Sequence, residues 1–209
     1  MKIAIVGSGH IGAGLARPWS KKGHSVTFAA REPGDAELVA LAKEVGAKTA
    51  SVSDGARGAD VVVLAMPYGA LDDVLKAAGD LAGKVVIDCT NAVERGPGGM
   101  ALKYGHTTSA AEELQKRLPR AKVFKSFNAQ GAENLAQPVY GGVAASNFFC
   151  GDDAEGRKAV KTLVEEIGFE AIDAGPLKNA RLVEPLMLLW MASSQALGTR
   201  DVAFKILRR

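Results

Sequence analysis

The chain alternates short apolar runs with longer amphipathic stretches, beginning at its first residues. The run KIAIVG from Lys2 to Gly7 is apolar and β-branched, which predicts a buried strand, and Ile11 to Lys22 has the spacing of a helix. Gly23 ends that helix, and SVTFAA from Ser25 to Ala30 predicts a second strand. A strand, a helix and a strand in this order predict a parallel βαβ unit.

The same alternation continues to the end of the chain. Further strands are predicted near Lys48–Val52, Asp60–Met66, Lys84–Thr90, Ala121–Phe127, Asn147–Cys150 and Glu170–Asp173, and further helices over Ala36–Val45, Ala70–Leu81, Ala110–Leu118, Asp153–Ile167 and from Asn179 onward. The Gly- and Pro-rich segment from Asn91 to Thr108 predicts a long loop. No linker or repeat interrupts the pattern. We therefore predict an α/β fold over residues 1–209 as a single domain, a Rossmann-type doubly wound and mostly parallel sheet with extra C-terminal strands and a terminal helix.

The composition of the chain limits the classes of partner that it is expected to bind. The 209 residues are 47% hydrophobic and 23% charged, which is typical of a globular protein. A net charge of +3 from 26 basic and 23 acidic residues argues against a nucleic-acid partner. Cys89 and Cys150 lie in apolar runs and are predicted to be buried thiols. The start of the chain has no signal-peptide pattern, and the apolar segment Leu182–Leu197 is interrupted by Glu184 and Pro185, so we expect a cytoplasmic protein without a membrane partner and a homodimer formed through that helix.

A glycine motif occupies the turn after the first strand. Residues 7–12 fit G-x-G-x-x-G between a predicted strand and a predicted helix, the context in which this motif binds a dinucleotide. The first glycine permits the turn, the second lets backbone amides approach a pyrophosphate, and the third allows close helix packing. The phosphate meets the helix N-terminus, where free N–H groups favour an anion. The predicted contacts are Gly7, Ser8, Gly9, His10, Ile11 and Gly12.

The end of the second strand indicates which dinucleotide binds. NAD-specific sites carry an acidic residue there, which binds the ribose 2′-hydroxyl, whereas this chain has Ala30 followed by Arg31. A guanidinium at this place favours a 2′-phosphate, so NADP(H) is predicted over NAD(H). Glu32 is the competing consideration, because a strand ending one residue later would bring that acid nearer to the ribose.

The other strand ends supply further candidates, because ligands of open α/β sheets sit beyond the carboxyl ends of the strands. Asn91 and Asn128 are candidates for ribose or carboxamide contacts, although asparagines also cap turns. The remaining predicted contacts are Met66, Pro67, Tyr68 and Ala129. No metal-ligand spacing and no nucleophile–base pair is evident, so no catalytic acid, base or nucleophile is predicted.

The chain resembles the coenzyme F420-dependent NADP oxidoreductase family along its whole length, most clearly in several segments. They are VGSGHIG, AAREP, AMPYGAL and, most specifically, CGDDAEGRKAVKTLVEEIG followed by DAGPLKNARLVE. The middle section, VIDCTNAV through KSFNAQGAENL, is similar to the cytosolic oxidoreductase domain of STEAP metalloreductases. Both families commonly have Ser-Arg at the turn that matches Ala30-Arg31, with the arginine near the 2′-phosphate. The resemblance carries over to Arg31 but not to a serine at position 30.

The resemblance implies an NADP-dependent oxidoreductase that passes a hydride between NADP(H) and a small-molecule acceptor. The second substrate is expected to be coenzyme F420, FMN or FAD, stacked on the nicotinamide beside the loop Arg95–Gly105 and the terminal helix. Three alternatives remain open. They are a reductase of a small organic substrate, like pyrroline-5-carboxylate reductase, a flavin-mediated ferric reductase, and a non-catalytic NADP(H) sensor.

Overall fold

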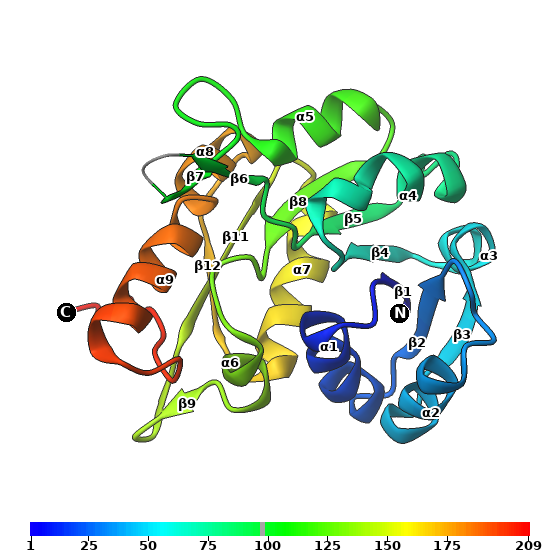
Figure 1. The fold of residues 1–209 in the computed structure, drawn as a ribbon, viewed down its shortest axis with the longest axis horizontal. Coiled ribbons are helices and arrows are strands. Elements are labelled where there is room, and N and C mark those ends of the chain that lie inside the picture. The colour runs from blue at the N-terminus through cyan, green and yellow to red at the C-terminus, as the bar shows by residue number, and fades with distance from the viewer. Residues whose placement is uncertain (97–98) are drawn as a thin grey trace.

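Eight strands of the protein form one continuous sheet (Figure 1). The structure, a computed structural model, describes residues 1–96 and 99–209. The strands are β1 Lys2–Val6, β2 Ser25–Ala30, β3 Lys48–Ser51, β4 Val61–Leu64, β5 Val85–Asp88, β8 Lys122–Ser126, β11 Ser146–Gly151 and β12 Glu170–Asp173. Their spatial order is β12-β11-β8-β5-β4-β1-β2-β3.

The order of the strands confirms the predicted Rossmann-type sheet. From β3 to β8 the pairs are all parallel and follow the order of a dinucleotide-binding sheet. The chain leaves β1 toward β2 and β3 and returns to β4 on the other side of β1. This reversal opens a crevice beyond the carboxyl ends of β1 and β4. The extra strands follow, with β11 antiparallel to β8 and β12 parallel to β11.

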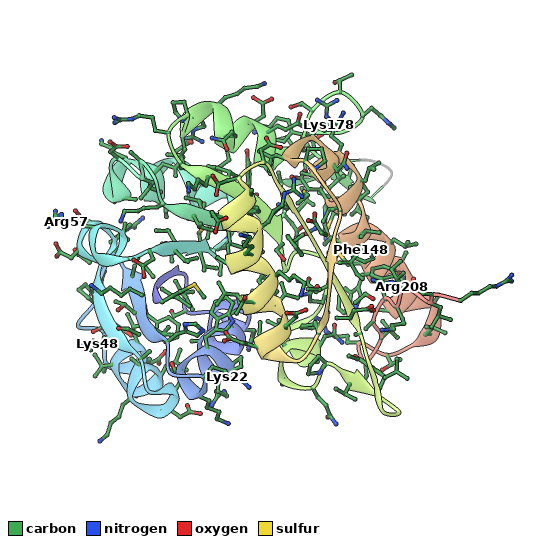
Figure 2. The ribbon with its side chains drawn as sticks, turned by 180° about the vertical axis from the view of Figure 1, so that it is seen from behind. Lys22, Lys48, Arg57, Phe148, Lys178 and Arg208 are labelled. Carbon is green, nitrogen blue, oxygen red and sulfur yellow. The ribbon has the colours of Figure 1, made fainter. Side chains whose placement is uncertain are left out.

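Helices cover both faces of the sheet, as the apolar runs require. Alternate residues of β1 point to opposite faces, with Ile3 and Ile5 in one core cluster and Ala4 and Val6 in the other. The first face carries α1 His10–Lys21, α2 Ala36–Val45, α6 Ala132–Ala136 and α7 Ala154–Ile167; the second carries α3 Val52–Gly58, α4 Leu71–Ala78, α5 Ala110–Arg117 and α8 Ala180–Val183. Figure 2 shows α7 in yellow lying across the sheet. Both cysteines are buried free thiols, as predicted. Burial raises the pKa of the Cys150 thiol to about 12 and that of Cys89 further, which keeps both protonated.

Besides α6 and the short strands β9 Val139–Tyr140 and β10 Val143–Ala144, which no sequence pattern predicts, two segments differ from the sequence prediction. The expected long loop contains an antiparallel hairpin of β6 Val93–Gly96 and β7 Gly99–Leu102. The sequences of these two strands, VERG and GMAL, contain too few apolar residues to show a strand pattern, and both strands are mostly exposed. The helix α3 was also not predicted, because Gly55 and Gly58 disfavour a helix. Ser51 caps it by accepting from the Asp54 backbone N–H, and Gly55 lies so close to β2 that a Cβ would be 2.8 Å from that of Ala29.

The C-terminal region extends from the β12 end of the sheet, on the opposite side of the molecule from β3 (Figure 1). Pro185 divides the predicted terminal helix into α8 and α9 Leu186–Leu197. Smaller elements are the short strands β9 Val139–Tyr140 and β10 Val143–Ala144 and the 3-10 turns η1 Tyr68–Ala70 and η2 Leu177–Asn179. Among the described residues, no helix combines the length and the apolar character needed to cross a bilayer.

Candidate functional site

The glycine loop joins β1 to α1, and its three glycines meet different surroundings. Gly7 has φ +109°, and a Cβ there would lie 2.4 Å from the Ala65 carbonyl oxygen. A Cβ on Gly12 would lie 1.9 Å from the Gly7 oxygen. A Cβ on Gly9 would meet no atom within 4 Å. The fold therefore requires glycine at 7 and 12, whereas the lack of a side chain at Gly9 leaves an approach open for a ligand.

The amino end of α1 suits an anion. Gly9 is its N-cap, no side chain caps the helix there, and its first turn contains no acidic residue. The first backbone N–H groups of a helix have no partner within the helix, and the helix dipole makes this end positive. A pyrophosphate at the glycine loop would satisfy these donors, so the loop fits the cofactor that the motif implies.

Two cavities open on either side of this loop. The first, of about 450 Å³, lies beyond β1 and β2 and is lined by Val6, Gly7, Ser8, Phe28, Ala29, Ala30, Arg31, Ser51, Val52, Ser53, Asp73, Val74 and Ala77. The second, of about 820 Å³, lies beyond β4 and β5 and is lined by Gly9, His10, Ile11, Ala65, Met66, Pro67, Tyr68, Gly69, Cys89, Thr90, Asn91, Val93, Glu94 and Lys103. We call them the adenosine-side cavity and the nicotinamide-side cavity, after the half of the dinucleotide that the sequence predicts at each.

The adenosine-side cavity contains the predicted 2′-phosphate residue. Strand β2 ends at Ala30, as expected, so Arg31 begins the loop and Glu32 is not among the residues that line the cavity. The Arg31 side chain is 81% exposed, and its nearest carboxylate is that of Asp73 on α4, at 3.5 Å. An exposed pair at this distance contributes little stability, so the guanidinium is available to a ligand.

The nicotinamide-side cavity brings together most of the other predicted contacts. Asn91 donates through Nδ2 to the Asn128 carbonyl at 3.1 Å, and Asn128 donates to the Val183 carbonyl at 3.2 Å. Asn128 and Ala129 are not among the described residues that line either cavity. Asn128 therefore supports Asn91 through the hydrogen bond to its backbone carbonyl and does not itself line the cavity. Its Oδ1 is buried and has no hydrogen-bond partner among the described residues. The preceding Phe127 has φ +58°, a conformation rarely adopted by a bulky residue, and its burial against Trp19 maintains it.

A buried ionic cluster lies beneath the end of β5. Lys125 on β8 is fully buried and donates to Asp88 Oδ2 at 2.8 Å and to the Thr90 carbonyl at 2.7 Å. The carboxylate of Glu184 is 3.6 Å away. Burial by itself lowers the pKa of Lys125, but the carboxylates of Asp88 and Glu184 outweigh burial and raise it, so the lysine is charged. Through the Thr90 carbonyl this cluster fixes the backbone that presents Asn91.

The late sequence motif DAGPLKNARLVE attaches the C-terminal region to this cluster. Glu184, its last residue, accepts from the backbone N–H groups of Ala110 and Ala111, both at 3.0 Å, at the start of α5. Arg181 forms a two-pronged ion pair with Glu112 at 2.6 and 2.8 Å. The motif therefore joins α8 to α5 and completes the charge balance around Lys125.

Of the segment Arg95–Gly105 predicted to border the acceptor, only Lys103 lines the nicotinamide-side cavity among the described residues. Val93 and Glu94, just before that segment, also line it. The expected terminal helix does not line it in the described residues; α9 borders a separate cavity of about 850 Å³ together with Gly99 and Met100 of β7. Residues 97 and 98 of the predicted loop lie outside the described residues.

Six polar residues that line these cavities are missing from the predicted contacts, and one of them is Thr90, next to the predicted Asn91. Ser51 ends β3, so the strand-end rule applied to the third strand would have identified it. The others are Ser53, Asp73, Glu94 and Lys103, which reach the site from helices or the hairpin and give no local signal.

The fold and the glycine loop define an α/β protein of the Rossmann type. The chain matches the family model of coenzyme F420-dependent NADP oxidoreductases over residues 2–92. A structure of a candidate F420-dependent NADP reductase from Arthrobacter sp. FB24 is 33% identical and superposes with a TM-score of 0.90, with all of both chains covered. The chain therefore belongs to the coenzyme F420-dependent NADP oxidoreductase family, and so to the NADP-dependent oxidoreductases.

Two further similarities extend this comparison. Metalloreductase STEAP3 of Rattus norvegicus is 31% identical over 192 residues, which are 90% of this chain but only 37% of that protein. A reductive aminase from Aspergillus terreus, solved with NADPH and ethyl levulinate, is 20% identical. It has a TM-score of 0.70 over 94% of this chain and 62% of its own. At this identity the aminase indicates a shared fold.

Proposed function

We propose that this chain binds NADP(H) across the two cavities and transfers a hydride between it and coenzyme F420 or a flavin. The observation that carries the proposal is the open space above Gly9, between two cavities and at the amino end of a helix without an acidic first turn. The name of the family and that of the Arthrobacter relative support the choice of NADP and F420.

The residues of the chain act by binding and positioning. The glycine loop holds the pyrophosphate, and Arg31 with Ser51 faces the 2′-phosphate. Thr90 and Asn91 orient the nicotinamide ring, supported by Lys125 and Asn128. A bound NADPH supplies the hydride, and its transfer to a planar acceptor needs ring stacking and exclusion of water more than a protein acid or base.

Arg31→Ala is expected to lower NADPH affinity by about tenfold while leaving NADH affinity unchanged, because only NADPH has the 2′-phosphate that pairs with the guanidinium. Calorimetric titration of both nucleotides measures the ratio. Arg57→Ala is the matched control, since Arg57 is an exposed arginine that pairs with Asp54 at the end of α3 (Figure 2). If the ratio of NADPH affinity to NADH affinity is unchanged in Arg31→Ala, Arg31 does not bind the 2′-phosphate and is an ordinary loop residue.

The acceptor is tested by mixing the protein with NADPH and, separately, F420, FMN, FAD or a ferric chelate, and following the loss of NADPH absorbance. We expect rapid oxidation with F420 or a flavin. With NADPH deuterated stereospecifically at C4, the label is expected on a deazaflavin ring carbon, because transfer between stacked rings is direct. Label found only in water would contradict direct transfer to F420. Oxidation by the ferric chelate alone would favour a metalloreductase, the function in the name of the STEAP3 relative.

We also propose a homodimer formed through the C-terminal helices. Leu182, Leu189 and Leu197 are 70%, 52% and 68% exposed, and Met191 is 39% exposed. Several large apolar side chains left exposed on two consecutive helices are typical of a surface that a partner covers.

A further inference from the structure

The lining of the nicotinamide-side cavity combines an aromatic ring and a cation. Tyr68, just after β4, and Lys103, just after β7, both line it. The Lys103 ammonium nitrogen lies 5.7 Å from the centre of the Tyr68 ring and 5.6 Å from that of Tyr104, within the range of a cation–π contact.

Tyr104 fixes the orientation of this pair. Its ring packs edge-on against Tyr68 with centroids 6.3 Å apart, and the Tyr68 hydroxyl donates to the Tyr104 hydroxyl at 3.3 Å. The Lys103 backbone N–H donates to the Ala92 carbonyl at 2.8 Å, which ties the hairpin to the segment after β5. Burial, followed by the hydrogen bond to Tyr104, raises the pKa of Tyr68, so its hydroxyl stays neutral beside the lysine. Tyr68, Lys103 and Tyr104 form what we call the Tyr–Lys cluster.

The charge of Lys103 is available to a ligand. Among residues 1–96 and 99–209, Lys103 forms no ion pair, and it is the only lysine or arginine that lines this cavity. The other titratable side chains along the described wall are His10, Tyr68, Cys89 and Glu94. At about 820 Å³ the cavity is large for a nicotinamide alone, because pockets of 300–1,000 Å³ enclose whole drug-sized ligands.

We propose that the Tyr–Lys cluster is the acceptor subsite, and that it selects a planar heteroaromatic acceptor carrying an acidic group such as a phosphate. Tyr68 provides a face for the ring, Tyr104 holds Tyr68 in place, and Lys103 pairs with the acidic group. This inference rests on the proposed function and specifies the class of acceptor for that site.

Two pairs of probes separate the ring from the acidic group. FMN and riboflavin have the same ring and differ in one phosphate, and F420 differs from its deazaflavin chromophore in the phosphate-bearing tail. Equilibrium binding of each is measured by calorimetry to the chain saturated with NADP⁺, which cannot donate a hydride. The phosphorylated member of each pair is expected to bind about tenfold tighter at low salt, with the difference decreasing as salt is added.

Lys103→Gln is expected to remove this difference by weakening FMN and F420 about tenfold while riboflavin and the chromophore are unchanged. Tyr68→Leu is expected to weaken both members of each pair alike, because it removes the ring contact. Lys48→Gln is the matched control, because Lys48 is an exposed lysine at the start of β3, away from the carboxyl ends of the strands (Figure 2).

The inference is overturned if neither pair shows a preference, if no probe binds, or if Lys103→Gln weakens both members of a pair equally or no more than Lys48→Gln does. Failure of the proposed function is a different result. It would appear as probes that bind with the expected preference but do not oxidise NADPH.

Discussion

Gly9→Val is expected to weaken NADPH binding by about 100-fold in a protein that still folds. A Cβ at Gly9 meets no atom within 4 Å, and its φ of −68° suits any residue, so the free chain has room for a side chain to start here. The side chain instead fills the space through which the pyrophosphate reaches the backbone N–H groups. Two lost hydrogen bonds to a charged phosphate, at about 1.5 kcal/mol each, correspond to an affinity loss of about 100-fold.

Calorimetric titration with NADPH measures the loss, and thermal unfolding shows that the variant is folded. Valine at this N-cap costs no more than about 1 kcal/mol, so only a small decrease in Tm is expected. Gly12→Ala is the contrasting variant, because its Cβ would lie 1.9 Å from the Gly7 oxygen. It should lower stability as well as binding. If folded Gly9→Val binds NADPH with wild-type affinity, the pyrophosphate does not bind at the glycine loop.

Lys125→Met is expected to cost about 3–5 kcal/mol of unfolding free energy at neutral pH, because it leaves the buried carboxylates of Asp88 and Glu184 without their cation. Methionine retains most of the volume, so the loss arises from charge and not from a cavity. Urea denaturation measures it through the transition midpoint at constant m. Lys122→Met is the matched control, since Lys122 lies on the same strand, is 36% exposed and pairs with Asp153. The control should change stability by no more than about 1 kcal/mol.

The pH dependence of this loss has a definite sign. In the wild type the raised pKa of Lys125 contributes stability that is complete below the unfolded-state pKa of a lysine and is lost as pH rises through the folded-state value. Lys125→Met lacks this contribution, so its deficit relative to the wild type should shrink as pH rises through the folded-state pKa of Lys125. A variant as stable as the control at pH 7 would show that the carboxylates are not held as charges.

The sequence by itself determined the sheet and the glycine loop. An apolar β-branched run such as KIAIV has few alternatives to a buried strand, and glycines at 7, 9 and 12 between a strand and a helix permit one local geometry. The end of β2 at Ala30, with Arg31 next to it, was likewise readable because strand ends follow from the apolar pattern. The strand-end rule also brought Met66, Pro67, Tyr68 and Asn91 to one cavity.

Only the tertiary structure decided which polar residues meet. Lys122 and Lys125 are both lysines of β8, yet Lys122 is partly exposed and pairs with Asp153, whereas Lys125 is fully buried beside Asp88 and Glu184, far along the chain. Asp73 reaches the adenosine-side cavity from α4, and Lys103 reaches the nicotinamide-side cavity from the hairpin. Local periodicity fixes which face of an element is apolar, but charge pairing depends on which elements pack together. Which elements pack together depends on how apolar surface is buried over the whole sheet, and a short stretch of sequence does not show it.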